Sequence, residues 1–127
     1  MIVTAQDLER LQSLVASQSG PAAEQLDAEL ARARVVLPQE VGSDVVTMNS
    51  DVVYEDLASG VQRRVRVVYP QHADAARGWV SVLAPLGSAL LGLRVGQDIE
   101  WRMPGGTRQV RVVAVPYQPE ASGDLAL

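Results

Sequence analysis

The first third of the chain carries apolar side chains at the spacing of α-helices. Its first run recurs at steps of three and four positions: Leu8, Leu11 and Val15. Thr4 and Asp7 form the threonine-x-x-acid arrangement that caps the start of a helix. The pattern therefore predicts a helix over about residues 5–17.

A second helical pattern follows the turn-forming stretch Ser17-Gln18-Ser19-Gly20-Pro21. Its apolar positions are Ala23, Leu26, Leu30, Ala33 and Leu37. Pro38 then stops the pattern. Each predicted helix has one narrow apolar stripe, so we expect the two to pack against each other as a short antiparallel hairpin, a coiled coil. The alternative, in which both helices pack on the rest of the domain, remains open.

After a linker at residues 38–44 the hydrophobic period changes to two and β-branched residues dominate, which indicates strands. The predicted strands are residues 45–48, 52–56, 61–69, 79–83, 98–103 and 109–115. Glycines and prolines separate them, so we expect a mainly antiparallel sheet. Arg64 and Arg66 point away from the valine side of their strand. With Glu100, Arg102 and Arg111 from neighbouring strands, they predict a solvated face of cross-strand charge pairs. A polyanion-binding face is the open alternative.

One segment interrupts the strand pattern. Pro85 at its start, Gly92 near its end and Ala89-Leu90-Leu91 between them predict a helix of about two turns that lies across the sheet. The fold class is therefore α+β: a short helical hairpin followed by a curled antiparallel sheet with one short helix. We expect residues 1–44 to form the hairpin arm and its linker, and residues 45–127 to form the sheet domain.

Composition narrows the classes of function. The chain of 127 residues has 47% hydrophobic and 20% charged residues, the balance of one folded globular domain. It contains no cysteine and one histidine, so disulfides, thiol nucleophiles and a structural zinc site are not expected. No apolar run is long enough for a membrane span and no signal-peptide pattern occurs, so the expected location is the cytoplasm.

Charge is distributed unevenly along the chain. Residues 1–44 hold seven acids and three arginines, which accounts for the whole net charge of −4. The remainder is neutral, so the chain lacks the broad basic field that non-specific phosphate binding requires. Independent binding to DNA or RNA is therefore not expected.

Motifs in the second half of the chain resemble a known family. Pro85-x-x-x-Ala-Leu-Leu-Gly, Val95-Gly-Gln-Asp and Pro104-Gly-Gly are similar to the C-terminal domain of the bacterial transcript-cleavage factors GreA and GreB, whose fold is FKBP-like. The closer resemblance is to the Rnk family, the regulators of nucleoside diphosphate kinase. It rests on Val45-Val-Thr-Met-Asn-Ser, Ala89-Leu-Leu-Gly-Leu-Arg-Val-Gly and Tyr117-Gln-Pro-Glu-Ala. It covers about residues 45–124, with a weaker match in the helical arm.

The resemblance implies a protein that binds RNA polymerase at the rim of its secondary channel, where the Gre-like domain grips a coiled coil of the β′ subunit. In the cleavage factors, two acidic residues at the arm tip help hold a catalytic magnesium ion. The tip here, Ser17, Gln18, Ser19 and Gly20, has no carboxylate, and a 13-residue helix is only about 20 Å long. We therefore expect a non-catalytic polymerase-binding regulator of transcription that competes with Gre-type factors, without catalytic residue, metal or cofactor.

The resemblance also indicates which residues contact the polymerase. Cleavage factors use the turn before the Pro-x-x-x-Ala-Leu helix, with a polar or acidic residue two places before the proline. Leu83 occupies that position here, so an apolar contact would replace a polar one. The interface candidates are Ser81, Leu83, Pro85 and Leu86. A core position at the end of a strand is the alternative for Leu83.

Three other functions fit parts of the sequence. An FKBP-type peptidyl-prolyl isomerase needs a concave pocket lined by aromatic side chains, and this chain has no Phe, three Tyr and two Trp. A phosphate-carrying His72 is disfavoured because the residue stands in a polar connector with no motif to orient it. Direct action on nucleoside diphosphate kinase stays open, since the sequence does not separate contact from an effect through transcription. We expect a monomer, although the apolar hairpin stripe could pair with a second copy.

Overall fold

The N-terminal third forms two helices and two short strands in the computed structural model, which describes residues 1–124. Strand β1 (Ile2–Thr4) leads directly into helix α1 (Ala5–Ser17), whose N-cap Thr4 accepts a hydrogen bond from the Asp7 backbone at 3.0 Å. A short turn joins α1 to α2 (Pro21–Ala31), and β2 (Arg34–Val36) follows. The bounds of α1 match the prediction because a cap and a clear period mark them.

The predicted second helix was too long. Instead of continuing to Leu37, the helix ends at Ala31, and β2 then pairs in parallel with β1 in the register Ile2 to Arg34. Neither of these three-residue strands was predicted, because runs so short carry no readable period. Their pairing ties the end of the hairpin to the first residues of the chain.

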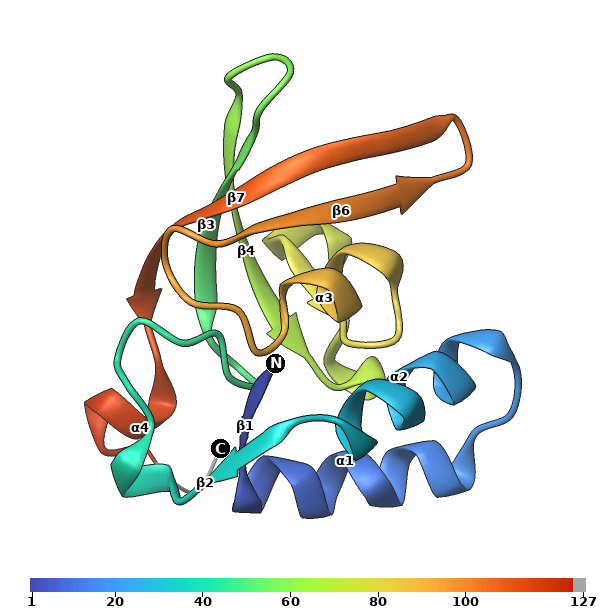
Figure 1. Cartoon of the computed structure of the whole chain (residues 1–127), viewed down its shortest axis with the longest axis vertical. Coiled ribbons are helices and arrows are strands. Elements are labelled where there is room, and N and C mark those ends of the chain that lie inside the picture. Colours follow the sequence, from blue (N-terminus) through green and yellow to red (C-terminus); the bar gives the residue numbers. More distant parts are fainter. Residues whose placement is uncertain (125–127) are drawn as a thin grey trace.

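The rest of the chain is built on a curled five-stranded sheet (Figure 1). Its strands are β3 (Asp51–Asp56), β4 (Gln62–Val68), β5 (Trp79–Ser81), β6 (Asp98–Met103) and β7 (Gly106–Tyr117). They lie in the order β5-β4-β3-β7-β6, and all neighbours are antiparallel except β4 and β5. The remaining helices and 3-10 turns are α3 (Pro85–Leu90), α4 (Pro119–Ser122), η1 (Pro38–Glu40), η2 (Pro70–His72) and η3 (Ala75–Arg77). The predicted α+β class is confirmed. Within residues 1–124, no helix has the length and apolar character that crossing a membrane requires.

One predicted strand was wrong. Residues 45–48 form a buried segment that ends in a turn at Met48, and only Val45 makes a bridge, an isolated one with Arg94. The Val46 N–H donates to the Leu93 carbonyl at 2.8 Å, and the Val46 carbonyl accepts from the Gly92 N–H at 2.9 Å. Val45 and Val46 therefore pair with the loop after α3, whereas the Thr47 N–H donates to the Ser50 hydroxyl and the Met48 N–H donates to Asp7. The segment is apolar because it is buried, although it belongs to no sheet.

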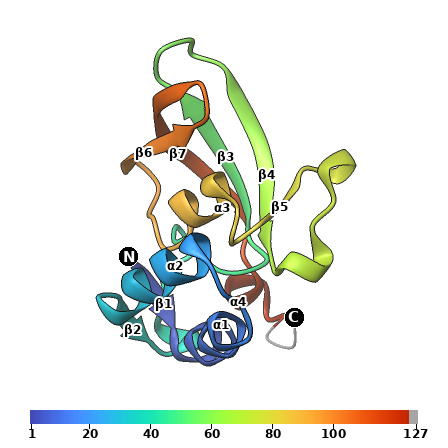
Figure 2. The ribbon, with the colours of Figure 1, turned by 90° about the vertical axis from the view of Figure 1, so that its right-hand side faces the viewer.

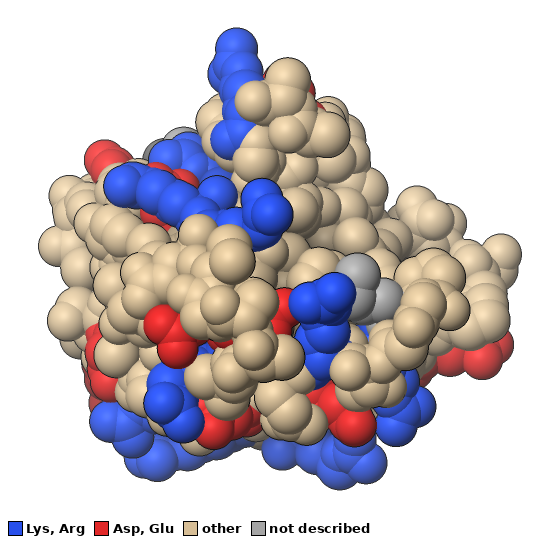
Figure 3. Space-filling view, turned by 90° about the horizontal axis from the view of Figure 1, so that it is seen from above, with Lys and Arg blue, Asp and Glu red and all other residues tan. Residues whose placement is uncertain are grey.

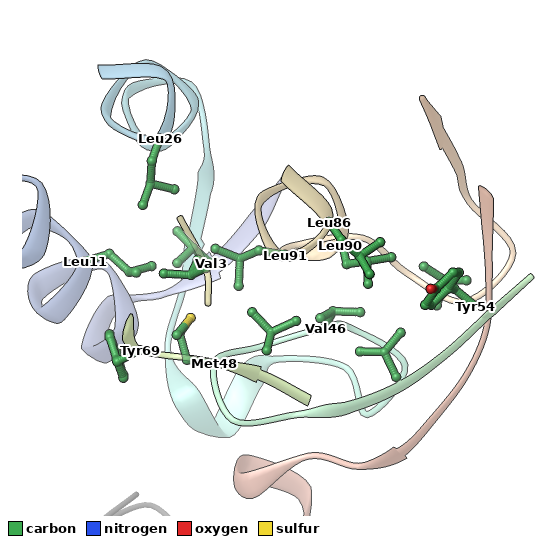
Figure 4. Close-up of a cluster of buried hydrophobic side chains, with 14 of the residues drawn as sticks. Val3, Leu11, Leu26, Val46, Met48, Tyr54, Tyr69, Leu86, Leu90 and Leu91 are labelled. Atoms are coloured by element: carbon green, nitrogen blue, oxygen red, sulfur yellow. The ribbon is translucent and has the colours of Figure 1, made fainter. Parts of the chain in front are cut away.

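The hairpin and the sheet share one hydrophobic core. Leu11 of α1 and Leu26 of α2 are 0% and 1% exposed, and both belong to the cluster that contains Met48, Val52 and Leu91 (Figure 4). Figure 2 shows the hairpin at the lower end of the molecule, with α2 below α3. The two helices contact each other, as predicted, and they also pack on the rest of the chain. The hairpin consequently does not project as a free arm.

Charge pairs cover the outer face of the sheet. Asp51 accepts hydrogen bonds from Arg64 and Arg66, each at 2.6 Å, and Arg111 pairs with Asp98 across β6 and β7 at 2.6 Å. Burial acts to raise the pKa of Asp51, but the two arginines lower it below its usual range. Figure 3 shows both signs of charge interspersed over one end of the molecule. Cross-strand charge pairs are confirmed for Arg64, Arg66 and Arg111, although their partners are Asp51 and Asp98; within residues 1–124, Glu100 and Arg102 join no such pair. The pairs leave less free positive charge for a polyanion.

Candidate functional site

The turn between β5 and α3 holds the candidate contact residues in a closed backbone geometry. The Ser81 hydroxyl accepts a hydrogen bond from the Leu83 N–H at 3.1 Å, and the Ser81 carbonyl accepts one from the Ala84 N–H at 3.0 Å. Pro85 then begins α3, where its missing N–H removes no helical hydrogen bond. The turn is therefore fixed by its own hydrogen bonds and by the start of the helix.

Gly87 allows α3 to lie directly against this turn. A Cβ at position 87 would stand 2.2 Å from the Ser81 carbonyl oxygen and 3.2 Å from the Val82 Cα. Both neighbours are backbone atoms, which cannot move aside as a flexible side chain would. The absence of a side chain at this position thus sets the distance between the helix and the turn.

The four predicted contact residues differ in exposure. Pro85 is exposed, Ser81 and Leu83 are half-buried, and Leu86 is 8% exposed within the core. Leu83 packs at the margin of that core and stays partly exposed, which is compatible with both of the roles that the sequence left open. A partner that reaches the turn would meet Pro85 and parts of Ser81 and Leu83, whereas Leu86 supports the turn from below.

A groove beside this turn includes a surface that the sequence did not predict. This α2–α3 groove has a volume of about 560 Å³, and its lining includes Leu83, Pro85 and Ala89 on one side and Ala22 and Gln25 on the other. Sequence reasoning missed the α2 side because α2 and α3 lie far apart in the chain. The one sequence signal for this surface was the apolar stripe of α2, because the buried stripe determines which positions of the helix remain exposed.

The turn between α1 and α2 carries no metal-binding chemistry. Ser17, Gln18 and Ser19 are exposed, and Gly20 has a φ of 110°. The Ser17 hydroxyl donates to the Leu14 carbonyl at 2.8 Å. In the described part of the chain, no group of three or more histidine, cysteine or acidic residues is placed to hold a metal ion.

A second groove, of about 940 Å³, lies between α1 and the chain after β4. His72 lines it together with Arg10 and the margin of Tyr69. Burial raises the pKa of the Tyr69 hydroxyl. His72 itself is exposed in η2, and within residues 1–124 no hydrogen bond or ion pair orients its ring. The arrangement gives no support to a histidine nucleophile, which needs an orienting partner.

The aromatic side chains are dispersed over the molecule. Tyr54 packs edge-to-face on Trp101, with ring centroids 6.2 Å apart. Trp79 and Tyr117 instead lie 5.1 and 5.2 Å from the guanidinium carbon of Arg66. Of the two grooves described above, the larger has Tyr69 and the imidazole of His72 among its lining, and the lining of the smaller includes no Phe, Tyr, Trp or His. The aromatic pocket that a peptidyl-prolyl isomerase requires is not formed by either groove.

A buried carboxyl group joins α1 to the rest of the chain. Asp7 is 6% exposed and accepts a hydrogen bond from the Met48 N–H at 3.1 Å. Burial raises the pKa of Asp7 to about 6, against the lowering effect of the Met48 hydrogen bond, and the charge of Glu120 adds to the rise. Glu120 of α4 accepts a hydrogen bond from the Thr47 hydroxyl at 2.7 Å. This junction connects α1, the segment at residues 45–48 and α4.

Two protein-family models match the chain, one in its N-terminal part and one in the remainder. Residues 39–117 match the family described as transcription elongation factor, GreA/GreB, C-term, and residues 1–36 match the family described as Rnk N-terminus. The regulator of nucleoside diphosphate kinase of Escherichia coli (strain K12) is 44% identical over 131 residues, which covers 100% of this chain and 96% of that protein. Transcription elongation factor GreB of Xanthomonas axonopodis pv. citri is 37% identical over 92 residues, which covers 72% of this chain and 55% of that protein.

Solved structures agree with the sequence matches. The prokaryotic transcription elongation factor GreA/GreB from Nitrosomonas europaea has a TM-score of 0.79 and 45% identity, over 92% of this chain and 98% of that one. Gfh1 of Thermus thermophilus, a GreA factor homolog, has a TM-score of 0.53 and 26% identity, over 92% and 99%. The family resemblance read from the motifs is thus confirmed. The chain belongs to the GreA/GreB family of transcription elongation factors, and along its whole length it is a relative of the Rnk regulators of nucleoside diphosphate kinase.

Proposed function

We propose that this protein is a non-catalytic regulator of transcription that binds RNA polymerase at the rim of its secondary channel, on the β′ coiled coil. The turn from Ser81 to Pro85 carries this proposal. It reaches the surface, its backbone is fixed, and it lies within residues 39–117, which match the GreA/GreB C-terminal family. The relative named as a regulator of nucleoside diphosphate kinase supports an effect on that kinase, which we assign to transcription.

The hairpin supports a role without cleavage chemistry. Magnesium is held by oxygen ligands, mostly carboxylates, and the exposed turn at residues 17–20 supplies none. Helix α1 has 13 residues and is therefore about 20 Å long. A protein with this hairpin would occupy the rim and leave the catalytic centre unchanged. It would compete with Gre-type cleavage factors, because two binders of one site exclude each other by mass action.

The test measures binding of the full chain to core RNA polymerase. Leu83→Arg should weaken binding by about tenfold or more, because it places a charge where the turn meets its partner. Leu37→Arg is the matched control, since Leu37 is 47% exposed and does not line the groove at the turn. Equal melting temperatures for the two variants would attribute the difference to contact and not to folding. Unchanged binding by the folded Leu83→Arg variant would contradict the assignment of the turn.

A competition assay tests the position on the polymerase. The protein should inhibit RNA cleavage by added GreB in arrested complexes, and the Leu83→Arg variant should inhibit less. The second candidate function is direct action on nucleoside diphosphate kinase, which the name of the relative supports. An unbiased pull-down from lysate distinguishes it from binding to polymerase. Recovery of that kinase without polymerase subunits would reverse the order of the two candidates.

A further inference from the structure

We propose that α2 forms the second wall of the docking site, so that the α2–α3 groove takes one face of a partner helix that presents apolar side chains and a basic residue. The proposal rests on the proposed function, since it extends the proposed contact surface beyond the turn from Ser81 to Pro85, which we call the docking turn. It assigns the hairpin a role in binding at the rim itself.

Because one side of α2 is buried in the core, the rotation of the helix determines which of its other residues lie at the groove. Ala23, Leu26 and Leu30 are 5%, 1% and 5% exposed. At 3.6 residues per turn, the positions on one side of this buried stripe are Ala22, Gln25 and Glu29. These three side chains line the α2–α3 groove. Because the core holds the helix in this rotation, the stripe is preformed and needs no rearrangement to meet a partner.

The opposite wall contains the docking turn. Pro85, Ser88 and Ala89 of α3 line the groove directly across from the α2 stripe, and Leu83 continues it. The floor is apolar and is formed by Leu91, Leu93 and Ile99. A volume of about 560 Å³ accommodates a few side chains and not a whole helix. The geometry therefore fits one apolar face of a helix, as in helix-in-groove recognition.

Charge at the rim of the groove indicates the polar part of the partner. Glu29 of α2 and Glu100 of β6 line the groove, and Arg102 is the basic residue among its lining. Glu29 also accepts a hydrogen bond from Arg32 at 3.2 Å, on the exposed surface of the hairpin. Over the whole lining the two glutamates are balanced by Arg102 and the Met1 ammonium, but Glu29 is the charged side chain of the α2 wall and gives that wall a negative charge. A lysine or arginine on the partner helix would complement it.

The experiment compares two arginine substitutions on the same helix. Ala22 and Ala31 are both exposed, but Ala22 lines the groove, whereas Ala31 ends α2 on the other side of the helix. Ala22→Arg should weaken binding of the full chain to core RNA polymerase by about tenfold, and Ala31→Arg by less than about twofold. Glu29→Gln should weaken binding and reduce its dependence on salt concentration, because it removes a charge from the interface.

The outcomes separate this inference from the proposed function. If Leu83→Arg weakens binding while Ala22→Arg and Ala31→Arg behave alike, the inference is wrong and the docking turn stands alone. If the wild-type protein does not bind polymerase, the proposed function fails, and the inference fails with it. Analytical ultracentrifugation gives a further check: a wild-type dimer that Ala22→Arg dissociates would assign the groove to a second copy of the chain and overturn the polymerase helix as occupant.

Discussion

The carboxyl group of Asp7 makes stability depend on pH in an unusual direction. Its pKa in the folded chain, about 6, lies above the ordinary value of 3.8, so the folded chain holds a proton that the unfolded chain releases. Asp7 therefore contributes stability that is fully present below the unfolded pKa and is lost as pH rises through about 6. The arginine-paired carboxyl groups of Asp51 and Asp98 have lowered pKa values and act in the opposite sense.

The substitution Asp7→Asn isolates this contribution. The asparagine carbonyl can still accept the hydrogen bond from the Met48 N–H, but it carries no charge at any pH. We expect the melting temperature of the variant, relative to wild type, to rise by several degrees between pH 4 and pH 7.5. Thermal melts followed by circular dichroism at both values measure it. A difference that stays constant with pH would show that the pKa of Asp7 is the same in the folded and the unfolded chain.

Gly87 provides a second test at the residue scale. In Gly87→Ala the new Cβ would meet the Ser81 carbonyl oxygen at 2.2 Å, so either α3 or the docking turn must shift. We expect a loss of about 1–3 kcal/mol in the free energy of unfolding, as for other overpacked sites. Gly105→Ala is the matched control, because a Cβ there meets nothing within 4 Å. Equal denaturant midpoints for the two variants would refute the close approach of α3 and the turn.

At the scale of elements, we expect that acidic residues added to the tip of the hairpin will not give the protein RNA-cleavage activity. Acids placed at the tip as Ser17→Asp with Ser19→Glu avoid Gly20, whose φ of 110° disfavours a side chain. This variant should still release no 3′ RNA fragment from arrested polymerase complexes, because a hairpin about 20 Å long that packs on its own domain leaves the carboxylates far from the catalytic metal. Fragment release by the acid-tip variant would show that α1 reaches far enough and lacks only the ligands.

The sequence predicted those elements whose local signals agree with their tertiary contacts. Thr4 caps α1 and Pro85 begins α3, and both helices start where these residues place them. The sequence pattern predicted the wrong structure where the hydrogen-bonding partners of a segment are distant in sequence. The end of α2 is set by pairing of Arg34–Val36 with β1, and Val45 and Val46 pair with the loop after α3. The turn at residues 81–85, which we propose for docking, was recognisable from its resemblance to a family motif, whereas the proposed α2 wall depends on packing between segments that are remote in sequence.

On the scale of the whole molecule, the shared core predicts cooperative unfolding. Leu11 and Leu26 of the hairpin lie in one cluster with Met48, so removal of residues 1–40 would expose the apolar groups that they cover. Far-UV circular dichroism reports mainly on α1 and α2, and fluorescence reports on Trp79 and Trp101, which both lie in the sheet. We expect the two signals to give the same unfolding midpoint. Loss of helix signal before the fluorescence change would make the hairpin an independent unit.

The fit of the first residues against Gly92 has a practical consequence. Gly92 has a φ of +81°, a Cβ there would lie 2.6 Å from the Met1 Cβ, and its carbonyl accepts a hydrogen bond from the Ile2 N–H at 3.1 Å. Met1 also lines the α2–α3 groove. A purification tag joined ahead of Met1 would therefore begin inside the groove and obstruct it. Binding studies need an N-terminus from which such tags have been cleaved, and immobilisation on a sensor surface should use the opposite end of the chain.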